Sequence, residues 1–314
     1  MRPKATDYGF DLDRMLSGVV SLRAEIPDDA FTAEVLGTER AGHGVVISDN
    51  GLILTIGYLI TEAENIWLAA NNGQVAQAHV VGYDQATGLG LVQALARLDV
   101  TPMSFGSIKD AHPGSRVILA GHGGQTQAIE AEVIAKREFA GYWEYLIDEA
   151  LFTSPAHPNW GGAACVGIDG RLLGIGSLLI QHSGGEEASA DGNMIVPVDL
   201  LPPILDDLLR FGQVQRPPRP WLGMFTADGS DDDVFVVGLA KGGPADEAGI
   251  EVADVVTKVG DEDIESLADM WRKIWAQGAA GVEISLTLMR EGRRLEKRLK
   301  SADRRSFLKQ ASVH

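Results

Sequence analysis

The sequence predicts a mainly β protein with at least two domains. Its 314 residues are more than a single hydrophobic core usually organises. The chain contains 37 glycines, and short apolar runs in its first two-thirds are interrupted by Gly, Asn and Asp. Because short strands separated by turn residues are typical of β-barrels, we expect barrel-type β structure over that part.

The expected strands form two successive blocks, followed by a helix. The first block runs from Val19 to about Leu98, and the second continues to about Ile180. Apolar runs mark strands of the second block at 116–120, 128–135, 150–153, 163–168 and 172–177. A final strand then leads into a helix. We expect this helix to begin near Asp199, a favourable N-cap, with Pro202 tolerated in its first turn.

The rest of the chain divides into a linker, a smaller domain and a tail. Residues 210–219 include a Pro-rich stretch that forms a stiff linker. Residues 220–301 contain short apolar strands around a helix expected from Ser266 to about Gln277. Residues 302–314 are a basic tail, and residues 1–18 are a polar N-terminal segment.

Composition disfavours nucleic acid and membranes as partners. The formal net charge of −17 disfavours nucleic acid and anionic membranes, and it is also what a solvated acidic surface produces. No apolar run approaches the ~20 residues of a membrane span. The N-terminal segment lacks the apolar stretch of a secretory signal. This predicts a cytoplasmic location, or a periplasmic one if a leader has been removed.

Three motifs lie in the first two-thirds of the chain. They are residues 44–60 (GVVISDNGLILTIGYLI), 82–92 (GYDQATGLGLV) and 158–162 (PNWGG). They resemble the segments that carry the catalytic triad in the bacterial HtrA/DegP family. The resemblance implies a chymotrypsin/trypsin-like double β-barrel over residues 19–209. It also implies that aromatic residues of the N-terminal segment, here Tyr8 and Phe10, hold a homotrimer together.

The positions that would carry the protease chemistry are all substituted. Tyr58 stands where the family has its histidine, Gly88 where it has aspartate, Trp160 where it has serine, and Pro158 at an oxyanion-hole glycine. A phenol with a pKa of about 10 cannot accept a proton at neutral pH, and glycine cannot orient a base. An indole only donates, and proline has no N–H. We therefore expect no catalytic residues at these positions.

The last third resembles a PDZ domain, a small α+β barrel, over residues 220–301. The resemblance rests on the stretch PWLGMF at 220–225, on GGPADEAGI at 242–250 and on the strands and helix that follow. PDZ domains add an extended peptide to a strand and capture its terminal carboxylate on loop N–H groups. The residues implied in peptide binding are Trp221, Leu222, Gly223, Met224 and Phe225.

The helix of this domain has two apolar stripes. Leu267, Met270 and Ile274 are expected to face the core, whereas Trp271 and Trp275 either line the peptide groove or pack at an interface. Ala253 stands where the family usually has glycine, which implies strain in that turn.

We therefore predict a catalytically inactive HtrA-like pseudoprotease that acts as a peptide- or protein-binding scaffold or adaptor, without a cofactor. Its partner would be a protein or peptide, including one with a free C-terminus. Two alternatives stay open. One is a serine-type endopeptidase or other hydrolase with a non-standard site around His157, Ser154 or Cys165. The other is a metal- or ligand-binding protein that uses His43 and His157.

Overall fold

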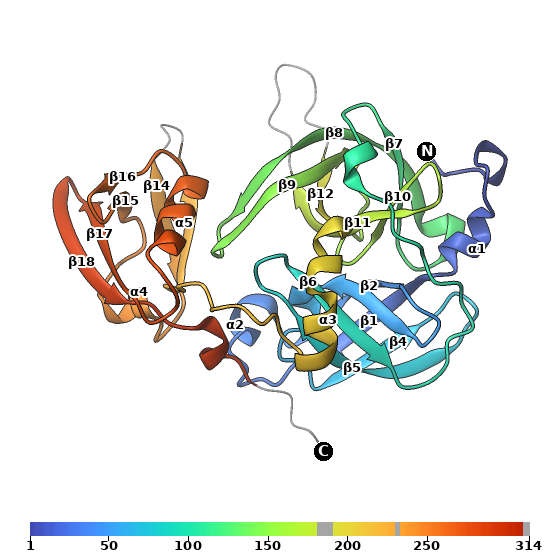
Figure 1. The fold of residues 1–314 in the computed structure, drawn as a ribbon, viewed down its shortest axis with the longest axis horizontal. Coiled ribbons are helices and arrows are strands. Elements are labelled where there is room, and N and C mark those ends of the chain that lie inside the picture. Colours follow the sequence, from blue (N-terminus) through green and yellow to red (C-terminus); the bar gives the residue numbers. More distant parts are fainter. Residues whose placement is uncertain (181–190, 230–232, 310–314) are drawn as a thin grey trace. The chain divides into compact units, whose positions relative to one another are not determined.

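The computed structural model describes residues 1–180, 191–229 and 233–309. The end of the predicted basic tail, residues 310–314, lies outside them. Contacts divide the chain into two units (Figure 1). The first contains Met1–Arg137, Glu149–Gln215 and Lys309, and the second contains Glu138–Asp148 and Arg216–Leu308. The division falls between Gln215 and Arg216, and residues 138–148 group with the C-terminal part of the chain.

The first unit begins with a closed six-stranded barrel. Its strands follow the order β1-β2-β3-β6-β5-β4. Their bounds are β1 (Val19–Glu25), β2 (Glu39–Val46), β3 (Leu52–Ile56), β4 (Asn65–Ala69), β5 (Val75–Tyr83) and β6 (Leu89–Ala94). Apolar side chains such as Leu22, Ile53 and Leu68 are fully buried. Along β4 the exposed residues Asn65 and Trp67 alternate with the buried Ile66 and Leu68, as expected for a barrel wall with one face in the core.

A second closed barrel completes this unit, in the order β10-β11-β12-β9-β8-β7. Its strands are β7 (Arg116–Ala120), β8 (Ala128–Gly141), β9 (Tyr145–Ser154), β10 (Ala164–Gly167), β11 (Leu172–Ile180) and β12 (Gly192–Pro197). All five strands marked by the sequence are present. However, β8 and β9 extend well beyond the predicted 128–135 and 150–153, and their tips form the segment Glu138–Asp148.

Short helices join the strands. They are η1 (Ala5–Asp7), α1 (Leu12–Leu16), α2 (Ala33–Leu36), η2 (Gly57–Leu59), η3 (Ile108–Asp110), η4 (Gly124–Gln127), η5 (Val198–Leu200) and α3 (Pro202–Phe211). The expected N-cap role of Asp199 is wrong. Its carboxylate instead accepts hydrogen bonds from Ser107 Oγ (2.5 Å) and the Ile108 N–H (2.9 Å), so it caps η3. α3 begins later, with Pro202 in its first turn as predicted.

The second unit is built on one sheet and one well-buried helix. The sheet follows the order β13-β14-β15-β17-β18, with β16 paired to β15. Its elements are β13 (Met224–Asp228), β14 (Val234–Leu239), α4 (Pro244–Glu247), β15 (Val255–Val259), β16 (Glu262–Asp263), α5 (Leu267–Ala276), β17 (Glu283–Arg290), β18 (Arg293–Lys300) and η6 (Arg304–Phe307). The predicted helix is confirmed, and Ser266 caps it by accepting a hydrogen bond from the Asp269 N–H.

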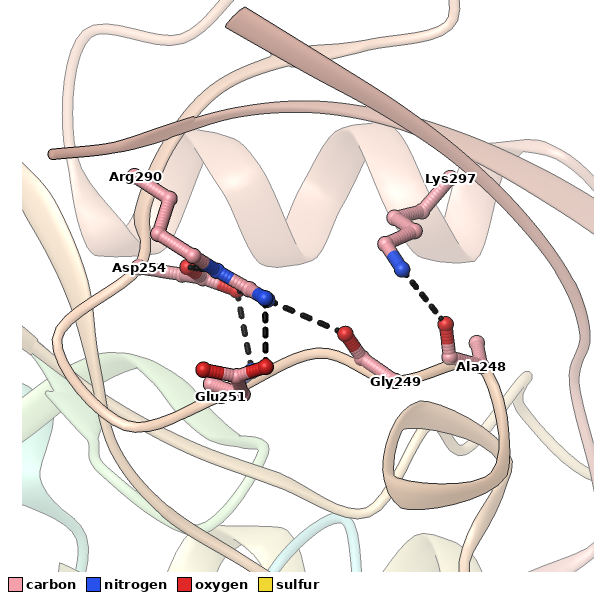
Figure 2. Close-up of polar contacts among 6 residues, drawn as sticks. All are labelled: Ala248, Gly249, Glu251, Asp254, Arg290 and Lys297. Atoms are coloured by element: carbon pink, nitrogen blue, oxygen red, sulfur yellow. Dashed lines mark hydrogen bonds and ion pairs between the residues drawn. The ribbon is translucent and has the colours of Figure 1, made fainter. Parts of the chain in front are cut away.

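An ion-pair cluster fastens the turn after α4 to the end of β17. Figure 2 shows the guanidinium of Arg290 directed at the carboxylates of Asp254 and Glu251 and at the Gly249 carbonyl. The Asp254 side chain is completely buried, and Arg290 holds its two oxygens at 2.6 and 2.7 Å. Lys297 of β18 donates to a carbonyl of the same turn. A paired, hydrogen-bonded geometry is what a buried carboxylate requires.

Candidate functional site

Tyr58 lies in η2, directly after β3. Its phenol donates a hydrogen bond to the Ser177 carbonyl at 2.9 Å. Burial raises the pKa of the phenol well above its ordinary value, although the indole of Trp160 hydrogen-bonds it and lowers the pKa. The group at this position is therefore a neutral phenol that already donates its proton to a backbone acceptor.

Gly88 stabilises the same region through its backbone. It has a positive φ of 75°, its N–H donates to the Asp84 carbonyl at 2.8 Å, and its carbonyl accepts from the Gly57 N–H at 2.7 Å. The Asp84 carboxylate accepts from the Thr87 N–H, which closes the turn before Gly88. Gly88 thus reaches the residue next to Tyr58 through its carbonyl, and no carboxylate at position 88 is available to orient a base.

The loop 158–162 packs on Tyr58. A Cβ on Gly161 would lie 2.9 Å from the Tyr58 Oη, so phenol and loop are in close contact. The Gly161 carbonyl accepts from the His43 N–H at 2.8 Å, and the Gly162 N–H donates to Gly176. The structure therefore brings Tyr58 and Trp160 together, and the Gly88 carbonyl bonds the residue next to Tyr58.

The two histidines near this loop are held in place by backbone groups. His157 is buried, and its Nδ1 accepts from the Asn159 N–H at 3.2 Å while its Nε2 lies 3.0 Å from the Gln127 carbonyl. His43 Nδ1 accepts from the His122 N–H at 3.2 Å. Burial, and then the rings of His157 and His122, lower the pKa of His43 to about 4. His157 thus positions the loop, and His43 is neutral near pH 7.

Neither histidine forms a catalytic pair or a metal centre with the other candidates. The His43 and His157 rings lie edge to face with centroids 6.4 Å apart. Within the parts of the chain that the structure describes, no three His, Cys, Asp or Glu side chains are arranged to hold a metal ion. The Ser154 hydroxyl donates to a backbone carbonyl. Cys165 is completely buried, which raises the pKa of its thiol to about 12.

The loop that the sequence marks for peptide binding presents three adjacent N–H groups. Gly223 has a positive φ of 74°, and a Cβ there would lie 3.1 Å from the Trp221 ring. This left-handed glycine turns the N–H groups of Leu222, Gly223 and Met224 toward one acceptor. That acceptor is a carboxylate of the chain itself, Glu144.

Glu144 was missed by the sequence analysis. It lies in the turn between β8 and β9, within the second unit, and it is buried. Burial raises the pKa of its carboxyl to about 8, while the three loop N–H groups and then Arg304 lower it. The sequence does show a charged residue, Glu144, directly after Tyr142 and Trp143 and between two apolar runs. Nothing in this local pattern indicates that its carboxylate contacts residue 223.

The two helix tryptophans are packed. Trp271 is completely buried in the core of the second unit, so it does not form an exposed wall of a groove. Trp275 stacks on it, with ring centroids 6.2 Å apart, and the Arg219 guanidinium covers Trp275 at 4.2 Å. Leu267, Met270 and Ile274 join the core as expected.

Comparison with known proteins agrees with this architecture. Residues 42–175 match the trypsin-like peptidase domain, and residues 220–300 match the PDZ domain. The serine endoprotease DegS of Haemophilus influenzae is 27% identical over 267 residues, which cover 83% of this chain and 76% of that protein. The chain is a homologue of the HtrA/DegP serine proteases.

Two other HtrA-type proteases are similar to this chain at a comparable level of identity. A probable periplasmic serine protease do/HhoA-like of Haemophilus influenzae is 27% identical over 274 residues, covering 82% of this chain. Serine protease Do-like HtrB of Bacillus subtilis is 26% identical over 270 residues, covering 78% of it. The matches span only 57% and 58% of these two relatives.

Solved HtrA structures share the fold. HtrA-type protease AlgW with decapeptide superposes with a TM-score of 0.54 at 20% identity, covering 93% of this chain and 97% of that one. The serine endoprotease from Yersinia pestis gives a TM-score of 0.52 at 23% identity, covering 96% of this chain and 99% of that one. Among the described residues, none of the helices combines the length and apolar character that crossing a bilayer requires.

Proposed function

We propose that this HtrA/DegP homologue is a catalytically inactive pseudoprotease that works as a peptide- or protein-binding scaffold or adaptor. The observation that carries the proposal is the contact between Tyr58 and Trp160. A phenol that donates to Ser177 stands at the position assigned to the base, and an indole stands at the position assigned to the nucleophile. Serine protease chemistry needs a hydroxyl, an imidazole that takes its proton and a carboxylate that orients the imidazole.

The expected loss of rate is large. Removal of a whole triad lowers kcat by on the order of 10⁶, and loss of an oxyanion-hole donor costs about 10²–10³. Pro158 has no N–H to offer, and the Asn159 N–H is bonded to His157. The surroundings of Ser154 and Cys165 also argue against a replacement nucleophile. The Ser154 hydroxyl donates a hydrogen bond to a backbone carbonyl, and the Cys165 thiol is buried.

Cleavage assays test this proposal directly. Purified protein is incubated with casein and with fluorogenic peptides, and serine- and cysteine-reactive probes are applied in parallel. We expect no turnover and no labelling of the folded protein. Turnover that disappears in Ser154→Ala or Cys165→Ala would overturn the proposal in favour of a hydrolase with a non-standard site. Bound metal that is lost in His43→Ala would instead support the metal-binding alternative.

Peptide binding is proposed for the loop that follows Trp221. Three convergent N–H groups next to an edge strand are the geometry that captures a terminal carboxylate. Gly223→Ala tests this role. The added Cβ would lie 3.1–3.2 Å from Trp221 and Ala240, which is closer than ordinary van der Waals contact, and alanine is strained in the left-handed backbone of this position. The matched control is Gly242→Ala, at a similar φ of 70° with nothing within 4 Å of the new Cβ. Partners that co-purify with the native protein and with Gly242→Ala should be lost from Gly223→Ala, and their retention would contradict this role.

Assembly and location complete the proposal. A homotrimer is proposed from the aromatic N-terminal segment, although the Tyr8 hydroxyl donates to Glu130 at 2.8 Å and Phe10 lies against Gly170 of the same chain. Light scattering after size-exclusion chromatography gives the mass directly, and a monomer would refute the trimer. The cytoplasmic location stays a prediction, and it differs from the periplasmic description of one Haemophilus relative. Fractionation of cells that express the full-length gene distinguishes the two.

A further inference from the structure

The PDZ loop of this chain already holds a carboxylate. Both the Leu222 N–H (3.0 Å) and the Gly223 N–H (2.6 Å) donate to Glu144 Oε1, and the Met224 N–H reaches the same oxygen at 3.2 Å. Oε2 accepts from the Leu222 N–H at 3.2 Å. Three N–H groups on one carboxylate oxygen saturate this loop, so a second carboxylate cannot bind there at the same time.

The residues before Glu144 contact the edge strand in the manner of a bound peptide. The Tyr142 carbonyl accepts from the Thr226 N–H of β13 at 2.9 Å. β13 is the edge of the sheet, and the Tyr142 ring packs edge to face on Phe225 with centroids 6.1 Å apart. The carboxylate of Glu144 and the carbonyl two residues earlier therefore engage the loop and the strand together. This is the pattern of strand addition with a captured carboxylate.

The base of the same segment is fixed to α5. Arg272 of that helix forms ion pairs with both Glu138 and Asp148, the first and last residues of the segment. Ala140 packs against the core of the unit. The segment 138–148 thus contacts the loop, the edge strand and the helix, which are the three elements that surround a PDZ peptide.

The backbone of Glu144 is held in a conformation that glutamate rarely adopts. Its φ is +58°, in the left-handed region that is unfavourable for residues other than glycine. Such a conformation persists where surrounding contacts fix it, and the contacts here are those of the side-chain carboxylate. The strain and the buried carboxylate point to the same role.

We propose that Glu144 is an internal ligand of the PDZ loop, so that a peptide with a free C-terminus binds only by displacing the segment 138–148. This rests on the peptide-binding role proposed above. A tethered competitor acts at an effective concentration in the millimolar range for short tethers. If the closed form holds 90–99% of the molecules, external peptide binds about 10- to 100-fold more weakly than to the open form.

The contact also defines the peptide that fits. Tyr142 lies two residues before Glu144, so a peptide in the same register carries its tyrosine two residues before its terminal carboxylate. The probe is a fluorescein-labelled synthetic peptide with the sequence of residues 139–143 followed by a C-terminal alanine with a free carboxylate. The same peptide with a C-terminal amide is the ligand control.

The decisive variant is Glu144→Gly in the full chain, because glycine removes the carboxylate and accepts the left-handed backbone. Glu291→Gly is the matched control. Glu291 also has a positive φ, +49°, and is exposed in the turn between β17 and β18. We expect the probe to bind Glu144→Gly at least 10-fold more tightly than it binds wild type or Glu291→Gly, and the amide to bind none of them. Equal affinity for all three proteins would overturn the proposal.

Hydrogen exchange of the loop gives a second, ligand-free measurement. The N–H groups of Leu222, Gly223 and Met224 should exchange faster in Glu144→Gly than in Glu291→Gly, while those within β17 stay unchanged. Unchanged protection of the loop would overturn the internal contact, and a probe that binds no variant would overturn the ligand assignment. Neither readout involves proteolysis. Cleavage of casein would therefore refute the proposed inactivity and leave this contact standing.

Discussion

Replacing Arg290 with leucine tests whether the cluster of Figure 2 stabilises the second unit. The substitution removes the partner of the Asp254 carboxylate, whose side chain is completely buried, while Arg290 itself is 26% exposed. Breaking a buried ion pair by removing one partner costs about 3–5 kcal/mol. Because Arg290 is partly exposed to water, we expect the lower end of that range.

The expected shift in melting temperature is large enough to measure. For a domain of this size each kcal/mol changes Tm by about 4–8 °C, so a loss of about 3 kcal/mol lowers it by roughly 12–24 °C. Three of the six tryptophans, Trp221, Trp271 and Trp275, lie in residues 216–308 and report on this unit by fluorescence. The full-length variant and the wild type are compared by thermal and urea unfolding.

The effect should also depend on pH. Burial raises the pKa of Asp254, but hydrogen bonds from Arg290 and from the Glu251 N–H outweigh it, so the pKa is lowered. A carboxyl with a lowered pKa in the folded state contributes stability above its ordinary pKa of about 4 and loses it as the pH falls. The difference between wild type and Arg290→Leu should therefore be larger at pH 7 than at pH 3.

The matched control is Arg294→Leu. Arg294 pairs with Glu296 on the surface, with side chains 60% and 69% exposed, so its loss should change stability by less than about 1 kcal/mol. A loss from Arg290→Leu of under about 1 kcal/mol, or one equal to that of the control, would refute the argument that the Asp254 charge is buried and paired.

Three further changes follow from single residues. Ala253 has a positive φ of 74°, so Ala253→Gly should raise the free energy of unfolding by about 0.5–1 kcal/mol, whereas Ala248→Gly should lower it; a loss from Ala253→Gly contradicts the strain. His43 has a pKa lowered to about 4, so its contribution to stability should be lost as the pH falls from about 6.5 toward 4; an NMR titration midpoint near 6.5 argues against its burial. Burial raises the pKa of Glu144 from about 4.5 to about 8, so its docking is strongest below pH 4.5, weakens as the pH rises toward 8 and levels off above it; probe affinity for wild type should therefore rise between pH 5 and 8, while that of Glu144→Gly stays flat.

The strands were predictable where periodicity is local. β7 was expected at residues 116–120 and lies there, because its signal is a short apolar run, Val117 to Ala120, that is buried throughout and present within one segment. β8 and β9 were predicted too short, since Glu138–Asp148 combines charged and aromatic residues whose burial depends on Arg272, Phe225 and the loop at 223. Asp199 was misplaced for a similar reason, because its partner, Ser107, lies 92 residues away in the chain.

The sequence by itself determined which chemistry the assigned triad positions can offer. No arrangement of the chain gives Gly88 a carboxylate, Trp160 a hydroxyl or Pro158 an N–H, because these are properties of the side chains and of the imide nitrogen. Only the tertiary structure decided which group the N–H groups of Leu222, Gly223 and Met224 bind. Glu144 and Gly223 are 79 residues apart, and a carboxylate is captured by N–H groups only where folding brings them within hydrogen-bond distance.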